Sequence, residues 1–207
     1  MKSAMPYYGI AMPELRRIVR ELTKVHPPSN DDVLKVWRGA THREEHYAAI
    51  ELSARLEGSW ELYDEMIVTG AWWDLVDPVA GRLWKLPDAQ SRLLAYSTDA
   101  NVWRRRAAII AQVGLRQETD WDLLQAVIEP NRADRSFWIR KGIGWALREY
   151  AKVEPERVRS YLERKEVSGL SRREAERGVA MGLSAGSGSR PPARGRTSAR
   201  GRARARG

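Results

Sequence analysis

Apolar residues recur at intervals of three and four along most of this chain, and no stretch alternates apolar and polar residues over the length of a strand. One apolar stripe follows Pro13 and consists of Leu15, Ile18, Val19, Leu22 and Val25. Such spacing is typical of one face of a helix, and Pro is well tolerated in the first turn of a helix. The sequence therefore predicts an all-α protein with about ten helices of roughly 8 to 18 residues each.

Helix-start signals of the capping-box type recur just ahead of these apolar stripes. They are Ser29 with Asp32, Thr41 with Glu44, Thr119 with Asp122, and Ser171 with Glu174. Short segments rich in Pro, Ser, Asn and Asp separate the stripes, as is usual between helices. The predicted helices therefore follow one another closely along the chain.

A faint internal repeat indicates how these helices stack. Residues 103–109 align with residues 138–144 at an offset of 35, each segment begins with Trp, and Trp73 lies 30 residues before the first segment. Repeats of about 30 to 47 residues with paired helices are typical of helical solenoids, whose units bury their apolar faces against their neighbours. Chance recurrence of Trp and Ala in helices is the alternative explanation.

Composition excludes several classes of protein. The 207 residues are 43% hydrophobic and 30% charged, and no run of about 18 apolar residues could span a membrane. The absence of Cys excludes disulfides, thiolate metal sites and cysteine nucleophiles. Because the N-terminus has no apolar core of a secretory signal, we expect a cytoplasmic protein.

Positive charge is concentrated at the C-terminus. The net charge is +9, but residues 182–207 contain seven Arg and no acidic residue, which leaves +2 for the rest of the chain. Gly, Ser, Pro, Ala and Arg offer little apolar surface to bury, so the sequence predicts a disordered tail after a domain of residues 1–181. The tail could hold phosphates without sequence preference, or reflect only the Arg-rich composition of the chain.

The densest aromatic stretch leads to a carboxylate. Trp72 and Trp73 precede Asp77, and Pro78 follows it directly. Since Pro disfavours helical geometry at the preceding residue and suits the first position of a helix, Asp77 is predicted to be a helix N-cap. The positive end of the helix dipole would keep this carboxylate ionised. A fixed anion beside two indoles suits a cationic ligand, whereas an ordinary capping Asp is the alternative.

A second aromatic cluster is also basic. One face of a predicted helix carries four residues spaced by three, four and three, namely Trp138, Lys141, Trp145 and Arg148. Basic residues among aromatics suit contact with phosphates and sugars, and an amphipathic core helix with solvent-reaching cations is the alternative. Gly142 and Gly144 cost about 1 kcal/mol each in a helix, which indicates that something packs or docks closely there.

Motifs for metals and nucleotide cofactors find no support. The segment from His42 to His46 matches the H-x-x-E-H spacing of one zinc protease class. No third ligand is signalled, and Thr41 with Glu44 already explains the segment as a helix start. The chain contains no G-x-G-x-x-G, P-loop or G-x-S-x-G motif. We therefore expect neither a metal nor a cofactor.

Four segments occur in an order and spacing that is specific for one family. They are residues 72–77 (WWDLVD), 102–109 (VWRRRAAI), 139–152 (IRKGIGWALREYAK) and 170–175 (LSRREA). With these segments the chain resembles the AlkD-like DNA alkylation repair glycosylases from about Met1 to Gly182. The resemblance implies a superhelix of HEAT-like helical pairs that holds duplex DNA in its concave face and removes N3- or N7-alkylated purines. We expect such a protein to act as a monomer.

The resemblance also implies roles for individual residues. The second Trp and the last Asp of the W-W-D-x-V-D motif are catalytic in the family, as is the Trp of the G-W-x-L-R-E-Y segment. The Arg of the R-A-A-I segment would hold a DNA phosphate. Together with the basic face, the predicted site comprises catalytic Asp77, Trp73 and Trp145 and DNA-binding Arg106, Lys141 and Arg148.

Two points qualify this resemblance. The family usually has a helix ahead of the segment that matches Met1, and we expect its absence to reduce an activity that an upstream extension restores. A noncatalytic helical-repeat scaffold that binds nucleic acid or protein is the alternative function, since a fold alone confers no activity. The pair of Asp77 and Trp73 separates the two, because a carboxylate repels phosphate and has no use at the centre of a simple polyanion binder.

Overall fold

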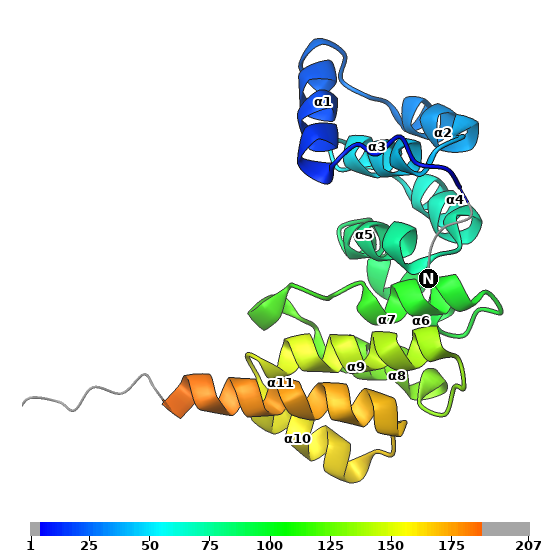
Figure 1. The fold of residues 1–207 in the computed structure, drawn as a ribbon. Helices are drawn as coiled ribbons and strands as arrows, with labels where there is room; N and C mark the ends of the chain where they lie inside the picture. Colours follow the sequence, from blue (N-terminus) through cyan, green and yellow to red (C-terminus); the bar gives the residue numbers. More distant parts are fainter. Residues whose placement is uncertain (1–4, 188–207) are drawn as a thin grey trace, which may run out of the picture.

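The computed structural model describes residues 5–187, and within that range it contains eleven α-helices, two 3-10 helices and no strand (Figure 1). The α-helices are α1 (Met12–Val25), α2 (Asn30–Gly39), α3 (Arg43–Ser53), α4 (Trp60–Gly70), α5 (Trp73–Leu83), α6 (Ala89–Ser97), α7 (Val102–Ile110), α8 (Trp121–Ile128), α9 (Phe137–Ala151), α10 (Pro155–Arg164) and α11 (Gly169–Ser187). The 3-10 helices are η1 (Arg116–Glu118) and η2 (Glu129–Asn131). The predicted all-α class is confirmed, and none of these helices is both long and apolar enough to cross a membrane.

The helices form a two-layer stack that runs from α1 and α2 at one end to α10 and α11 at the other (Figure 1). In one layer the odd-numbered helices contact one another in sequence order, from α1 through α3, α5, α7 and α9 to α11. Even-numbered helices cover them, with α2 on α3, α4 on α5, α6 on α7 and α10 on α11. One continuous core runs from Val33 to Val179. Each pair thus buries its apolar face against the next, and the predicted helical-repeat solenoid is confirmed.

The predicted helix starts are correct at one place and displaced at others. At α2 the Asp32 amide donates to the Ser29 hydroxyl at 3.2 Å, and the Ser29 amide donates to the Asp32 carboxylate at 2.9 Å, as predicted. At α8 the N-cap is Asp120 rather than Thr119, because its carboxylate accepts the Leu123 amide at 3.0 Å. The start predicted at Ser171 lies inside α11, which begins at Gly169.

The start of α3 is capped by His42 with Glu45, so the predicted pairing of Thr41 with Glu44 is wrong. The Glu45 carboxylate accepts the backbone amide of His42 at 2.9 Å, and such backbone bonds hold the pKa of Glu45 at about 2. Glu44 has another task, since its buried carboxylate accepts the backbone amides of residues 8–10. Glu44 therefore fastens the N-terminal segment to α3.

The apolar stripe predicted for α1 is only partly buried. Leu15 and Val19 are 5% and 2% exposed. Ile18, Leu22 and Val25 are 37%, 59% and 71% exposed. Because α1 lies at the end of the stack and packs chiefly on α3, one side of its apolar stripe stays exposed.

Helices α9 and α11 approach each other unusually closely. A Cβ atom at Gly178 of α11 would overlap the backbone oxygen of Arg148, and one at Gly182 would overlap that of Ala151, both in the last turn of α9. This packing lets α11 continue to Ser187, so the predicted boundary between residues 181 and 182 falls within a helix. The rest of the predicted tail, residues 188–207, lies outside the described residues.

We predict that Gly178→Ala lowers the free energy of unfolding by about 1–3 kcal/mol, because the added methyl group must displace the α9 backbone. Gly81→Ala in α5 is the matched control, since no atom lies within 4 Å of its added Cβ. That change should be neutral or stabilise by up to about 1 kcal/mol. Urea denaturation of both variants measures the difference, and equal stability would contradict the close approach of α9 and α11.

Candidate functional site

Three tryptophans join the N-terminal ends of α5, α7 and α9. The Trp138 ring centroid lies 5.2 Å from that of Trp72 and 5.6 Å from that of Trp103. Such clusters bury large apolar area and hold neighbouring helices in register. Trp72, rather than Trp73, is the tryptophan that contacts Trp103 and Trp138, although Trp72 is the N-cap of α5 whereas Trp103 and Trp138 are the second residues of their helices.

Next to this cluster, Asp77 of α5 forms a bidentate ion pair with Arg106 of α7. The Arg106 Nε and Nη2 atoms donate to Oδ1 and Oδ2 of Asp77 at 2.7 Å each. The two side chains are 6% and 12% exposed, respectively. Asp77 is not an N-cap as predicted, because α5 starts at Trp73 and continues through Asp77 and Pro78. Arg106, rather than a helix N-terminus, provides the positive charge beside the carboxylate.

Burial and the ion pair act in opposite directions on Asp77. Burial raises the pKa of Asp77 above its ordinary value, and the negative charge of Asp74 adds to that increase. The hydrogen bonds and charge of Arg106 lower the pKa of Asp77 and so favour its ionised form. The ionisation of Asp77 therefore depends on Arg106.

Each nitrogen of the Arg106 guanidinium group is engaged within the protein. Its Nη1 atom donates to the backbone oxygen of Trp138 at 2.6 Å, so Arg106 links α5 to α9. Gly142 lies beside the same Nη1 atom, where an added Cβ would be 3.4 Å away. At Gly144 an added Cβ would come within 2.8 Å of Glu174, so the predicted close packing is confirmed there, whereas the surroundings of Gly142 leave room for ordinary contact. This arrangement gives Arg106 a contact with Asp77, whereas the expected phosphate contact would need an opening of the pair.

The two other residues expected to be catalytic are tryptophans of α5 and α9. Trp73 is 45% exposed and lies four residues before Asp77 on α5, so the indole and the carboxylate are neighbours on one helix surface. Trp145 is partly buried and follows Gly142 by three residues on α9. Trp73 and Asp77 thus lie one helical turn apart on α5, beside Arg106 of α7, and Trp145 comes from α9.

The predicted basic residues of α9 are held by a carboxylate from α11. Glu174 is 9% exposed and accepts from Lys141 Nζ at 3.1 Å and Arg148 Nη1 at 2.6 Å. Its pKa is lowered, most strongly by the hydrogen bond from Lys141. Lys141 and Arg148 remain 39% and 32% exposed. Both cations are therefore fixed in position while part of each still reaches solvent.

A second carboxylate near the site was not assigned a role from the sequence. Asp74 accepts the Tyr47 hydroxyl at 2.7 Å and forms an ion pair with Arg43, whose side chain is 5% exposed. Asp74 and Asp77 are three residues apart on α5, and each is bound by an arginine of a neighbouring odd-numbered helix. The W-W-D spacing signals Asp74, but nothing in the sequence indicates that Arg43 binds it.

Metal ligands do not gather in the structure. Between residues 5 and 187 no group of three or more His, Asp or Glu side chains could hold an ion. In the H-x-x-E-H segment, Glu45 caps α3 and the His46 ring packs 4.4 Å from that of Trp37. The segment therefore serves the start of a helix.

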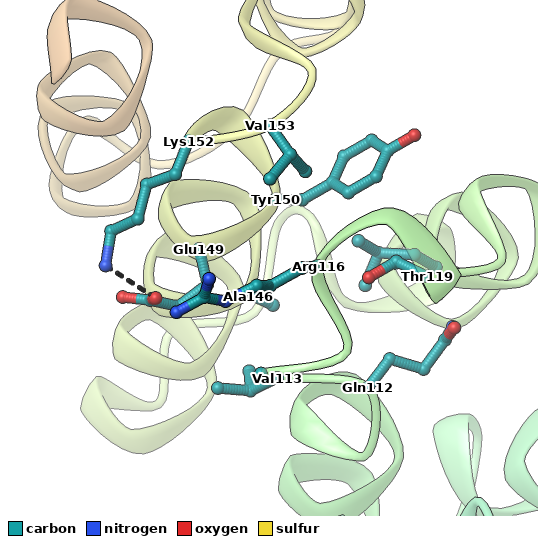
Figure 2. Close-up of a pocket in the computed structure, with 11 residues that line it drawn as sticks. Gln112, Val113, Arg116, Thr119, Ala146, Glu149, Tyr150, Lys152 and Val153 are labelled. Atoms are coloured by element: carbon teal, nitrogen blue, oxygen red, sulfur yellow. Dashed lines mark hydrogen bonds and ion pairs between the residues drawn. The ribbon is translucent and has the colours of Figure 1, made fainter. Parts of the chain in front are cut away.

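A cavity of about 380 Å³ lies between the α7–α8 connection and the C-terminal half of α9 (Figure 2). Two of the residues that line the cavity form an ion pair, in which Lys152 Nζ donates to the Glu149 carboxylate at 2.6 Å. The Gln112 amide group exchanges hydrogen bonds of 2.7 and 3.1 Å with the backbone of Asp120. Because these groups are already partnered and Asp77 is absent from the lining, this cavity is separate from the candidate site.

The fold and the site define a helical-repeat protein with a buried carboxylate, held by arginine, beside an exposed indole. A family model for DNA alkylation repair enzymes matches residues 1–178, and the chain belongs to that family. A solved structure described as a predicted DNA alkylation repair enzyme from Enterococcus faecalis is similar, with a TM-score of 0.69 and 28% sequence identity. The match covers 83% of this chain and 87% of that chain. None of the curated proteins matches this chain.

We predict that Asp77→Asn lowers the free energy of unfolding by about 1–3 kcal/mol, because an amide leaves the buried Arg106 charge without its partner. Asp64→Asn in α4 is the matched control, since Asp64 also receives two bonds of 2.7 Å, from Arg104 of α7. The Asp64 side chain is 29% exposed against 12% for Asp77, so its loss should be smaller. Urea titrations that rank the two variants in the opposite order would contradict the buried pair.

Proposed function

We propose that this protein is a DNA glycosylase that removes cationic N3- or N7-alkylated purines from duplex DNA. Membership in the DNA alkylation repair enzyme family supports DNA as its partner. The observation that carries the proposal is the buried Asp77 carboxylate, fixed by Arg106 and one helical turn from the exposed Trp73. A carboxylate at the centre of a DNA-binding protein repels phosphate, so it needs a chemical reason to be there.

The reaction needs no general acid. An N3- or N7-alkylated purine already carries a positive charge, so its glycosidic bond breaks with the electron pair passing to N9 and neutralising the departing base. Positive charge then develops on the deoxyribose, and an ionised Asp77 stabilises it more in the transition state than in the ground state. A water molecule attacks C1′ and releases a proton, which Asp77 or solvent accepts. Ordinary glycosidases, by contrast, use a second carboxylic acid to protonate the leaving group.

The indoles add to this stabilisation. Trp73 presents an exposed ring one helical turn from Asp77, and aromatic ring faces attract cations. Each correctly placed ring contributes about 0.5 to 2 kcal/mol, depending on how far water is excluded. Trp145 is proposed to contact the same sugar from α9. These contacts favour a cationic substrate over a neutral one.

Arg106 acts in this proposal by positioning Asp77, while Lys141 and Arg148 contact the DNA backbone. The guanidinium fork sets the direction of both carboxylate oxygens and keeps them ionised. Lys141 and Arg148 are fixed by Glu174 and exposed enough to reach a phosphate. Such contacts set the register of the protein on DNA without reading its sequence.

We predict that Asp77→Asn reduces release of 7-methylguanine by about 100-fold to 1,000-fold, the usual effect of losing one group that stabilises transition-state charge. The assay incubates protein with methylated genomic DNA, without metal or cofactor, and detects free alkylpurine by chromatography. Asp64→Asn should retain the wild-type rate because Asp64 lies outside the site. Release at the wild-type rate by Asp77→Asn would refute the mechanism, and no release by the wild-type protein would favour a noncatalytic scaffold.

We predict a pH dependence that reports on Asp77. Because burial raises the pKa of Asp77, enzymatic release should fall as the pH drops through that raised value and the carboxylate gains a proton. Lysine cannot form the two parallel bonds of Arg106, so Arg106→Lys should raise the pKa further and move the acid limb to higher pH. Arg104→Lys should leave the limb in place. If the acid limb of the Arg106→Lys variant lies at the same pH as that of wild type, Arg106 does not control the ionisation of Asp77.

A further inference from the structure

The connections from α8 to α9 and from α10 to α11 lie at the α11 end of the stack (Figure 1). Residues of both connections line a second cavity. We name it the arginine hollow because three arginines line it, Arg132, Arg135 and Arg140. Its volume is about 690 Å³. We propose that the arginine hollow is an oxyanion site that binds a phosphate group.

Buried donors without acceptors carry this proposal. The Nε atoms of Arg132 and Arg140 are both buried, and neither has a hydrogen-bond partner. A buried donor left unpaired costs about 1–3 kcal/mol, and both arginines line the hollow, so a ligand oxygen that reached either Nε atom after a small side-chain movement would gain a hydrogen bond. Phosphate suits this need, because guanidinium groups bind its oxygens through charge-assisted hydrogen bonds.

The charges around the hollow also favour an anion. Arg140 and the exposed Arg135 make no ion pair within the described part of the chain. Two of the acidic residues at the hollow are already neutralised, since Asp134 pairs with Arg105 at 3.1 Å and Glu129 pairs with Arg132 at 2.9 Å. Glu129 also receives Lys165 Nζ at 3.3 Å, which leaves Glu166 as the acidic lining residue without a cation.

The position of the hollow connects it to the candidate site. Asp134, on its lining, is held by Arg105, and the next residue, Arg106, binds Asp77. Arg140 lies in the first turns of α9, close in sequence to Trp138, whose backbone oxygen also receives Arg106. A phosphate of bound DNA is therefore one source of the oxyanion, and this arm of the inference rests on the proposed function. A free phosphate is the other source.

Two measurements separate these sources. The first follows the Nε–H signal of Arg140 by NMR during titration with inorganic phosphate. The second measures the affinity for an unmodified DNA duplex by fluorescence anisotropy over a series of NaCl concentrations, for wild type, Arg140→Gln and Arg135→Gln. Arg159→Gln is the matched control, because it removes one exposed positive charge from α10 away from the hollow. Exposed Arg135 can be changed without disturbing the fold.

If the hollow binds the DNA backbone, each hollow variant lowers the slope of log affinity against log salt by about one, and Arg159→Gln leaves it unchanged. A shift of the Arg140 signal with inorganic phosphate, but with unchanged DNA slopes, supports the oxyanion site and assigns it to free phosphate. If phosphate leaves the signal unmoved and all slopes equal that of wild type, the proposal is overturned. Neither of these two measurements depends on base release, so they test the arginine hollow even if the protein shows no glycosylase activity.

Discussion

The contact between Arg106 and Asp77 is the interaction on which the site depends. One guanidinium group on α7 binds the carboxylate of α5 through two atoms and the backbone of α9 through the third. Three consecutive helices of one layer therefore meet at a single buried charge pair. Removing either partner leaves the other charge buried, which is why such a pair fixes the geometry as well as the charge of the site.

Helix α7 supplies two arginine–carboxylate pairs, and their different burial indicates different roles. Arg104 binds Asp64 of α4 in the covering layer, and both side chains are about 30% exposed. Arg106 binds Asp77 inside the odd-numbered layer, where burial and the ion pair oppose each other in setting the pKa of the carboxylate. The first pair joins the two layers, whereas the second holds a carboxylate beside an exposed indole. The Arg104–Asp64 ion pair therefore stabilises the fold, whereas the Arg106–Asp77 ion pair is proposed to serve the reaction.

Sequence reasoning predicted the helices because their apolar spacing depends only on local residues, and the family resemblance located Trp73 and Asp77. Sequence reasoning failed for features that depend on contacts between residues far apart along the chain. The rule that Pro follows an N-cap misplaced Asp77, since α5 begins one turn earlier and tolerates Pro78 within it. The partner of Asp77 lies 29 residues away along the chain, so the sequence did not indicate that Arg106 is buried against Asp77. Buried hydrogen-bond donors without a partner, such as Arg140 Nε, cannot be predicted from the sequence.

The central claim is that Asp77 stabilises positive charge on the deoxyribose, and binding of a charged sugar analogue tests it most directly. Two duplexes can be compared, one with a cationic pyrrolidine in place of the damaged nucleotide and one with a neutral tetrahydrofuran. Wild-type protein and Asp64→Asn should bind the cationic duplex more tightly, because analogues of a charged transition state profit from the same carboxylate. Asp77→Asn should bind the two duplexes equally. If Asp77→Asn kept the full preference for the cationic sugar, the carboxylate would have no part in stabilising that charge.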